Sequence, residues 1–419
     1  MNILLIGSGG REHAISWKLQ QSLIQHKLYI APGNSGTSSI GENIDIAVTD
    51  FDSIEQCVND KDIDIIIVGP EVPLVKGIVD HFKEHDVFVF GPDQESAQLE
   101  GSKEYAKLFM DEYGIPTASY RSFGVKDMES GLAYIDKLAT PIVLKADGLA
   151  AGKGVLILDN TVDAKREFTE MLSGKFGDAS TTVVIEEFLS GLEFSVFVLT
   201  DGHSYKVLPL AKDYKRIGEG DTGLNTGGMG AISPVSFVDD VLFKKVEDRV
   251  IQPTIRGIQE RSLNYNGVVF IGLISVDGEP YVIEYNVRFG DPETEVILPR
   301  LKTDLLEVIL AIRDHFLEDI NIEIDPRYVS TVMLVSGGYP EAYEKGKLIS
   351  GLSEVNGSIP FHAGATLVDG EMLTNGGRVM AISSFGNSQE DALTKSMRNA
   401  EKIQFDGKYF RTDIGFDLT

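Results

Sequence analysis

The first hundred residues alternate short apolar segments with stretches of helical spacing, and this alternation limits the fold more than any other feature of the chain. Apolar segments without polar alternation are typical of strands covered on both faces, as in a parallel sheet. Arg11–Gln21 and Leu74–Glu84 carry helical spacing. We therefore predict a doubly wound α/β domain with ligand loops at the carboxyl ends of its strands. The expected strands, each followed by Gly or Pro, are Asn2–Ile6, Leu28–Ala31, Ile63–Val68 and Val87–Phe90.

Length, charge and cysteine content limit the classes of protein to which the chain can belong. Its 419 residues, 42% of them hydrophobic, suffice for two to four domains at about 150 residues each. A formal charge of −26 repels phosphate backbones and argues against nucleic acid as a partner. Cys57 is the single cysteine and cannot form an internal disulfide, so we expect a cytoplasmic location. No apolar segment approaches the roughly 18 residues of a membrane helix, so no membrane partner is expected.

Beyond residue 100 the pattern changes to mixed helices and strands. A helix is predicted over Lys103–Tyr113, because Gly114 and Pro116 follow it. Two strands, Ile142–Ala146 and Gly154–Leu158, flank a glycine-rich loop. A strand-rich stretch then extends to about residue 325, interrupted by a long polar loop over 212–230. The tail from residue 327 has further strands and ends with a predicted helix over 389–403.

The loop after the first strand, Gly7-Ser8-Gly9-Gly10-Arg11-Glu12, is a candidate anion-binding loop. Glycines let the backbone approach an anion, and the amides that open the next helix can bind it. Glu12 stands where a dinucleotide fingerprint needs its third glycine, and the second strand ends without a ribose-binding acid. A sugar phosphate is therefore favoured over NAD, with a tight turn that binds nothing as the alternative.

The segment Lys145–Gly154 (KADGLAAGKG) is the most informative in the chain. Lysines at a strand end and in a glycine-rich loop suit a flap that closes over nucleotide phosphates. The rival interpretation, a Walker A loop, fails because Gly148 and Gly152 are too close together. Gly154 also stands where a Ser or Thr would ligate magnesium. A plain hairpin turn remains the alternative.

Acidic residues lie at both ends of the segment Glu186–Glu193 (EEFLSGLE), between two predicted strands. An acid at a strand end, next to exposed backbone, could bind an adenine edge and ribose hydroxyls. Solvated surface acids are the alternative.

Glu284, Asn286 and Arg288 alternate at the end of the strand predicted over Pro280–Tyr285. Residues i and i+2 of a strand share a face, so Glu284 and Asn286 would present oxygen ligands of the kind that Mg²⁺ prefers. Arg288 on the same face could hold a transferring phosphoryl group. A charged face on a solvated edge strand is the alternative.

Taken together and in order, these motifs resemble the phosphoribosylamine–glycine ligase family of ATP-grasp enzymes over essentially the whole chain. The segments that carry the resemblance include GSGGREHA (7–14), APGNSGT (31–37), KADGLAAGKGV (145–155), EEFLSGLEFS (186–195), NTGGMGAISP (225–234) and EYNVRFGDPE (284–293). The resemblance implies a multidomain α/β and α+β fold. Its parts would be a Rossmann-like domain at 1–100, an ATP-grasp core at 101–120 and 188–325, a mobile lid at 121–187 and a small C-terminal domain at 326–419.

The implied activity is ATP-dependent ligation of glycine to 5-phospho-D-ribosylamine, giving glycinamide ribonucleotide, ADP and phosphate in purine biosynthesis. The glycine carboxylate would form an acyl phosphate, and the ribosylamine nitrogen would then displace phosphate. Such a reaction needs positioning and electrostatic stabilisation rather than a side-chain nucleophile. The implied cofactors are ATP with Mg²⁺ or Mn²⁺, and the implied assembly is a monomer or weak homodimer.

The resemblance also assigns roles to individual positions. Those implied for ATP binding are Lys103, Lys145, Gly152, Lys153, Glu186, Phe188, Leu189 and Glu193, with Lys107 as a weaker match. Those implied for the ribosylamine and the substrate-side loop are Gly9, Gly10, Asn34, Ser35, Glu71, Asn225, Gly227 and Gly228. Those implied for the transfer chemistry are Asp213, Arg288 and Asp291, and the implied metal ligands are Glu284 and Asn286.

One departure and three alternatives stay open at this point. Many ATP-grasp enzymes place another metal-binding acid on the strand before the E-x-N strand, but here that strand, 268–273, is apolar. The protein therefore supplies fewer metal ligands, and phosphate oxygens and water would complete the shell. The alternatives are another ATP-grasp ligase or carboxylase, an NAD-dependent oxidoreductase, and a nucleotide-responsive binding protein without turnover.

Overall fold

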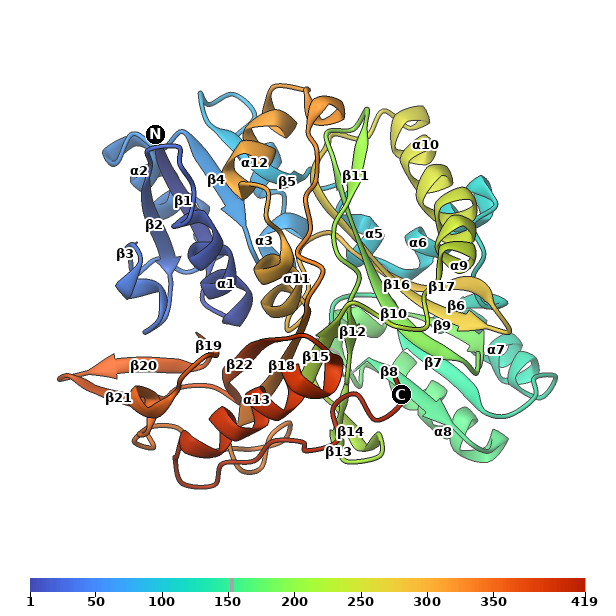
Figure 1. Ribbon diagram of the computed structural model, residues 1–419. Coiled ribbons are helices and arrows are strands. Elements are labelled where there is room, and N and C mark those ends of the chain that lie inside the picture. The colour runs from blue at the N-terminus through green and yellow to red at the C-terminus, as the bar shows by residue number, and fades with distance from the viewer. Residues whose placement is uncertain (151–153, 419) are drawn as a thin grey trace.

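Three regions pack around the middle of the molecule in the computed structural model, which describes residues 1–150 and 154–418 (Figure 1). The N-terminal region is blue, the central region runs from cyan through yellow, and the C-terminal region is orange and red. A mixed sheet with the order β11-β10-β16-β5-β4-β1-β2-β3, in which β17 also pairs with β16, extends from the first region into the second. The fold is therefore a mixed α/β multidomain fold.

The N-terminal strands are parallel; four of them were predicted and are largely buried, and the short β3 is an unpredicted, more exposed addition. They are β1 (Asn2–Gly7), β2 (Lys27–Pro32), β3 (Glu42–Asn43), β4 (Ile65–Val68) and β5 (Phe88–Pro92). Ile3–Ile6 and Ile65–Ile67 are almost fully shielded from solvent, which explains why these strands are apolar without alternation. The first helix, α1 (Gly10–Leu19), begins directly after the Gly7–Gly9 loop.

One N-terminal helix differs from the prediction and another was not predicted. The helix expected over Leu74–Glu84 is two short helices, α3 (Glu71–Val75) and α4 (Ile78–His81). Gly77 separates them with a φ of 85°, a left-handed conformation that interrupts the helix and that glycine adopts without strain. The unpredicted helix is α2 (Phe51–Asp60), which begins at an Asp50 cap.

The central region joins the N-terminal sheet through β16 (Tyr265–Val276). This strand pairs antiparallel with β5, where Tyr265 lies opposite Pro92. It also pairs with β10 (Leu192–Thr200) and β17 (Glu279–Asn286), and β11 (Tyr205–Val207) extends that side. The helices of this region are α5 (Gln98–Gly101), α6 (Lys103–Tyr113), α9 (Asp240–Val246), α10 (Gln252–Glu260), α11 (Thr294–Arg300) and α12 (Leu305–Arg313).

A four-stranded sheet with the order β6-β9-β7-β8 forms a unit with its own hydrophobic core, at the lower right of Figure 1. Phe123, Leu144 and Phe168 are buried in that core. Its elements are β6 (Tyr120–Gly124), α7 (Met128–Ile135), β7 (Ile142–Ala146), β8 (Val155–Leu158), α8 (Thr161–Leu172) and β9 (Thr182–Glu187).

The C-terminal region shares a second sheet, of order β12-β15-β18-β22-β19, with the central region. The segment 212–230, expected to be a loop, contains β12 (Lys212–Asp213) and a hairpin of β13 (Arg216–Gly218) and β14 (Thr222–Asn225). The other elements are β15 (Gly230–Ser233), β18 (Tyr328–Val335), β19 (Ile359–His362), β20 (Ala365–Val368), β21 (Glu371–Thr374), β22 (Arg378–Gly386) and α13 (Gln389–Lys402).

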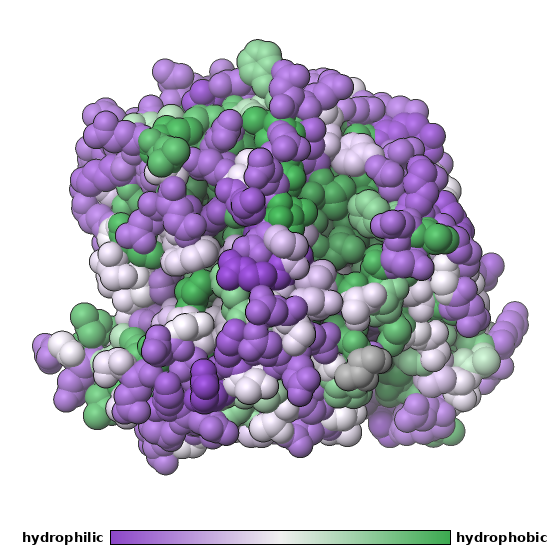
Figure 2. Space-filling model, viewed as in Figure 1, coloured by the Kyte–Doolittle hydropathy of each residue, from purple (hydrophilic) through white to green (hydrophobic). Residues whose placement is uncertain are grey.

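The surface is mainly hydrophilic on the face drawn in Figure 2, in keeping with the strongly acidic composition. Hydrophobic side chains gather on this face between β11 and the α9–α10 helices. No helix among residues 1–150 and 154–418 is both long and apolar enough to cross a membrane.

Candidate active site

Two lysines converge on one buried carboxylate where the four-stranded sheet meets the central region. Lys145 at the end of β7 and Lys107 of α6 place their Nζ atoms 3.0 Å and 3.2 Å from Glu186 Oε2. Burial lowers the pKa of Lys107 to about 8. Glu186 Oε1 is buried and has no hydrogen-bond partner among residues 1–150 and 154–418, so within this part of the chain one carboxylate oxygen is left for a donor such as an amino group. We call Lys103, Lys107, Lys145 and Glu186 the lysine cluster.

Lys103 begins α6 and faces the glycine-rich loop that follows β7. Its Nζ lies 3.5 Å and 3.3 Å from the carbonyl oxygens of Asp147 and Gly148. Burial lowers the pKa of this lysine. The structure thus brings Lys103 and Lys145 together at the start of the predicted flap. Gly152 and Lys153, also predicted here, lie outside the described residues.

The segment between β9 and β10 places the other predicted nucleotide residues nearby. Phe188 and Leu189 follow β9, and Phe188 is exposed. Glu193, at the start of β10, accepts from Lys215 Nζ at 3.1 Å, and this lysine holds the pKa of Glu193 below its usual range. Lys215 Nζ also lies 4.0 Å from both Asp213 Oδ1 and Glu284 Oε1. Lys215 therefore joins three predicted site residues, and its own role was not predicted.

The end of β17 presents Glu284 and Asn286 on one face, as their spacing predicts. Gly272 and Phe270 of β16 lie opposite them, so the neighbouring strand supplies no acid at this level. A bulge beside Gly272 leaves Ile283 unpaired, and its carbonyl oxygen accepts from Lys145 Nζ at 3.1 Å. This contact links β17, which carries the predicted metal ligands, to the lysine cluster.

A metal ion bound by Glu284 and Asn286 would need further ligands in addition to these two side chains. The described residues contain no group of three or more His, Cys, Asp or Glu able to hold a metal ion. Glu284 is partly exposed, and Asn286 is buried with Oδ1 3.0 Å from Arg288 Nη2. Two oxygen ligands suit Mg²⁺ that is bound through nucleotide phosphates and water.

Arg288 is held by acids from the N-terminal half of the chain. Its Nη2 donates to Glu100 Oε1 at 2.7 Å, and its Nε lies 3.4 Å from Glu71 Oε2. Burial raises the pKa of Glu100 to about 7. Glu71 was predicted to contact the ribosylamine together with residues of the first two loops. In the structure it lies beside Arg288 instead.

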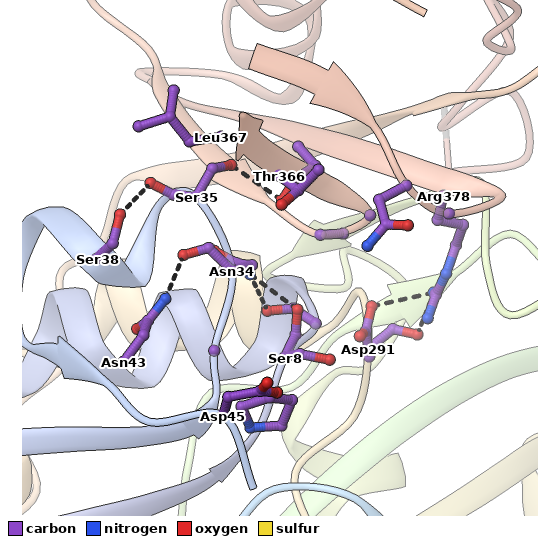
Figure 3. Close-up of a pocket in the computed structure, with 18 residues that line it drawn as sticks. Ser8, Asn34, Ser35, Ser38, Asn43, Asp45, Asp291, Thr366, Leu367 and Arg378 are labelled. Carbon is purple, nitrogen blue, oxygen red and sulfur yellow. Dashed lines mark hydrogen bonds and ion pairs between the residues drawn. The ribbon is translucent and has the colours of Figure 1, made fainter. Parts of the chain in front are cut away.

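A cavity of about 790 Å³ opens between the N-terminal and C-terminal regions (Figure 3). Gly9, Asn34 and Ser35, all predicted for the ribosylamine, line it. Gly10 lies outside its lining, packed against buried Glu295. We call it the interdomain cavity. Its other lining residues are Ser8, Pro32, Gly33, Ser38, Asn43, Asp45, Asp291, Ala363–Leu367, Asn375, Gly376 and Arg378.

The Asn34 side chain fixes the wall of this cavity. Its Nδ2 donates to the carbonyl oxygens of Ser8 and His362 at 2.9 Å and 2.8 Å, and its Oδ1 accepts from Gly36 N at 2.8 Å. Ser35 Oγ lies 2.8 Å from His362 Nδ1. Asn34 and Ser35 thus fasten the C-terminal region to the first loops of the N-terminal region.

Asp291 connects the cavity to β17. It follows the end of that strand by five residues and lines the cavity wall. Arg378 Nη1 lies 3.0 Å from Asp291 Oδ1 and donates to the carbonyl oxygens of Asp291 and Gly227. Gly228 packs on Pro292 with a φ of 116°, and Asn225 ends β14. The 225–228 loop and Asp291 therefore meet at Arg378.

Comparison with known proteins settles the family. Models of the phosphoribosylglycinamide synthetase N, ATP-grasp (A) and C domains match residues 1–100, 101–294 and 329–417. A phosphoribosylamine–glycine ligase of Vibrio vulnificus is 46% identical, over 99% of this chain and 98% of the relative. The chain belongs to the phosphoribosylamine–glycine ligase family.

Further members of the family agree in sequence and in structure. The Haemophilus influenzae phosphoribosylamine–glycine ligase is 45% identical, over 99% of this chain and 98% of its own length. The crystal structure of the Thermotoga maritima phosphoribosylamine–glycine ligase matches with a TM-score of 0.85 and 35% identity, covering 99% of this chain and all of that one. The family assignment confirms the predicted fold class and predicted enzyme class.

Glu12 explains why the first loop of this ligase is not a dinucleotide site. Its buried carboxylate accepts from the Gly9 amide and lies against Gly7 and Gly69. An acid thus stands where a dinucleotide pyrophosphate would approach the loop, which counts against the oxidoreductase alternative.

Several site residues carry no signal that our sequence analysis detected. Arg378, Tyr339 and His362 come from the C-terminal region and reach the site only through the fold. Glu293 is buried, and burial raises its pKa to about 7. Arg378, Tyr339 and His362 stand among ordinary strand and turn residues. Glu293, in contrast, is the last residue of the segment EYNVRFGDPE (284–293) and could have been found there.

Proposed function

We propose that this chain ligates glycine to 5-phospho-D-ribosylamine at the expense of ATP, giving glycinamide ribonucleotide, ADP and phosphate. The observation that carries the proposal is the position of Asp291. The loop after β17 leads from Glu284 and Asn286 directly to the wall of the interdomain cavity. A nucleotide at the lysine cluster and a sugar phosphate in the cavity would therefore meet at one loop.

On this proposal Lys103 and Lys145 neutralise ATP phosphates, and the free oxygen of Glu186 accepts from the adenine amino group. Glu193 binds the ribose hydroxyls, with the adenine between Phe188, Leu189 and the flap. Glu284 and Asn286 would hold Mg²⁺ or Mn²⁺, which would supply charge neutralisation at the phosphates. The single carboxylate and amide support a cation shared with the nucleotide.

The chemistry needs two transfers and no protein nucleophile. The glycine carboxylate attacks the γ-phosphorus and ADP leaves, which yields glycyl phosphate. The ribosylamine nitrogen then attacks the carbonyl carbon, loses a proton and expels phosphate. Arg288 would stabilise charge on the transferring phosphoryl group, and Asp213 and Asp291 would orient glycine. The ion pair with Glu100 and the hydrogen bond that Arg288 donates to Asn286 Oδ1 support this orientation of Arg288.

We also propose domain limits and cellular properties that follow from the function. The sheet β6-β9-β7-β8 and its separate core support a lid at 121–187. The core would then span 101–120 and 188–325, between an N-terminal domain at 1–100 and a C-terminal domain at 326–419. A cytoplasmic location and a monomer or weak homodimer stay predictions.

ADP release in the presence of Mg²⁺, measured with glycine and freshly generated phosphoribosylamine omitted in turn, tests the proposal. We expect release to require both substrates and the mass of glycinamide ribonucleotide to appear. If ADP is released only with another pair of acid and amine substrates, the chain is a different ATP-grasp ligase. ATP binding without turnover would favour a nucleotide-responsive binding protein.

A further inference from the structure

The interdomain cavity raises an electrostatic question that its N-terminal wall does not answer. The proposed ribosylamine carries a phosphate group of about −1.5 to −2 charge, and the whole chain carries −26. Two carboxylates, Asp45 and Asp291, also line the cavity. A phosphate bound there needs a cation or free amides to offset this repulsion.

Backbone amides of the N-terminal wall already have partners within the protein. Gly9 N donates to Glu12 Oε2, and Gly33 N donates to the carbonyl of Gly7. Asn34 N donates to Thr37 Oγ1, and Ser35 N donates to the carbonyl of Ala365. Gly9, Asn34 and Ser35 are among the residues predicted for the ribosylamine, and a ligand could use these four amides only by displacing the contacts that they make.

Arg378 is the one Lys or Arg among the described residues that line the cavity. Its Nη1 donates to the carbonyl oxygens of Asp291 and Gly227 and forms an ion pair with Asp291 Oδ1 at 3.0 Å. Among residues 1–150 and 154–418 we find no hydrogen bond from its Nε or Nη2, and neither atom is sealed from solvent. The guanidinium is thus anchored on one edge and has donors left on the other.

Gly227 packs closely against the Arg378 guanidinium on the side of Nε and Nη2. A Cβ at position 227 would lie 2.9 Å from the Arg378 Cζ and 3.1 Å from both Nε and Nη2. Any side chain there would push the guanidinium away from the loop. The absence of a side chain at 227 and the position of Arg378 are therefore coupled.

We propose that Arg378, from the C-terminal region, binds the 5-phosphate of the ribosylamine through Nε and Nη2 while Nη1 holds Asp291 and the 225–228 loop. This inference rests on the proposed function for the identity of the sugar. A planar guanidinium can offer two parallel donors to a phosphate, which a lysine cannot. The same side chain then ties occupancy of the cavity to the loop that carries Asp291.

Binding of ribose 5-phosphate and of ribose, measured by calorimetry without ATP, tests the inference directly. We expect the wild-type protein to prefer ribose 5-phosphate by about 10-fold or more, as one charge-assisted bidentate contact allows. Arg378→Gln should abolish the preference and leave the affinity for ribose within about twofold, while Arg378→Lys should retain part of it. Arg398→Gln, at an exposed position of α13, is the matched control and should retain all of it.

Steady-state kinetics separate phosphate binding from a merely structural effect. Arg378→Gln should raise the KM for phosphoribosylamine by about 30-fold or more and those for ATP and glycine by less than about threefold. Asp291→Asn, which removes the ion pair alone, should lower kcat but retain the preference for ribose 5-phosphate.

Each remaining outcome is decisive. A preference that persists in Arg378→Gln, a wild-type protein without any preference, or a rise confined to the KM for glycine would overturn the inference. Ligase turnover with an unchanged preference in Arg378→Gln would leave the proposed function standing. Loss of the preference in a protein without ligase turnover would retain the phosphate site and reject the ligase.

Discussion

In the lysine cluster three lysines contact a carboxylate and carbonyl oxygens of the protein. The interdomain cavity is lined mainly by hydroxyls, amides and backbone, with two carboxylates and one cation, Arg378. Lys107 and Lys145 share Glu186, and Lys103 faces two loop carbonyls. The cavity wall depends instead on the neutral side chain of Asn34 and its network. The two sides of the site are thus held by different kinds of interaction.

The difference has a physical consequence for ligand binding. A charged ligand phosphate can compete for the lysines, because ion pairs between flexible side chains rearrange easily. A buried amide network has no comparable freedom, since each broken contact leaves an unpaired polar group. We therefore expect substitutions in the lysine cluster to act mainly on ATP, and substitutions in the cavity wall to act on the sugar and on stability together.

The largest effect should come from Glu284→Ala, which tests the point where the two sides meet. Loss of the carboxylate that we propose as a metal ligand should lower kcat by about 10³-fold or more. The melting temperature should change little, because Glu284 is partly exposed and its nearest cation is 4.0 Å away. Glu279→Ala, at an exposed ion pair of the same strand, is the control. Near-normal turnover of Glu284→Ala would refute the metal assignment.

Asn34→Ala should affect the cavity side and spare the lysine cluster. It removes a buried amide that joins Ser8, Gly36 and His362, so we expect a loss of about 2–4 kcal/mol in the free energy of unfolding. The KM for phosphoribosylamine should rise about 10-fold, while ATP affinity stays within about twofold. Denaturant titration and steady-state kinetics measure both, with exposed Asn321→Ala as the control. An equal loss of ATP affinity would abolish the distinction between the two sides.

The two sides also differ in how far the sequence predicts them. Lys103, Lys145 and Glu284 lie at the ends of regular elements whose patterns are local, and the structure ends α6 and β7 where those patterns end. The cavity is completed by Arg378 and His362, more than 300 residues along the chain from Asn34. Contacts of that separation depend on how β18, β19 and β22 assemble, which no local pattern encodes.

Two further differences in the fold each depend on a single feature, one local and one distant in the sequence. The helix expected over 74–84 is interrupted at Gly77, where the apolar spacing continues but the backbone turns left-handed. The segment 212–230 reads as a polar loop, yet it forms a hairpin because buried Arg411 pairs with Asp221 beside it. Hydrophobic periodicity detects neither a backbone reversal nor a single buried ion pair.

Lys107→Met tests whether the lysine cluster tolerates the loss of a cation. Burial lowers the pKa of Lys107 to about 8, below its value in an unfolded chain, about 10.4. The unfolded protein therefore binds more protons between these values, and this lysine makes stability rise with pH across that window. The variant should lack this rise and bind ATP about 5-fold more weakly. Denaturant titrations at pH 8, 9 and 10 measure it against exposed Lys302→Met. Identical pH slopes in variant and wild type would show that Lys107 does not titrate there.

The smallest effect is expected from Glu100→Gln, at the contact that orients Arg288. Burial raises the pKa of Glu100 to about 7, so the folded protein binds more protons than the unfolded chain from about pH 4.3 to pH 7. This carboxyl therefore lowers stability as the pH rises through that window, and its penalty is complete above pH 7. Only the ionised form pairs fully with Arg288 Nη2, 2.7 Å away, so kcat should rise with pH near 7.

Val287 N and Arg288 donate to different oxygens of Glu100, so glutamine keeps an acceptor for only one of them, and it has no charge to lose. The variant should therefore lose the rise of kcat near pH 7 and turn over about threefold more slowly at pH 8. Its phosphoribosylamine KM should be unchanged, since Glu100 lies outside the cavity lining. A pH–rate profile of kcat between pH 5.5 and 9 measures the effect. A rise that persists at the same pH in Glu100→Gln would assign it to another group, with Glu293, whose pKa burial also raises to about 7, as the next to replace.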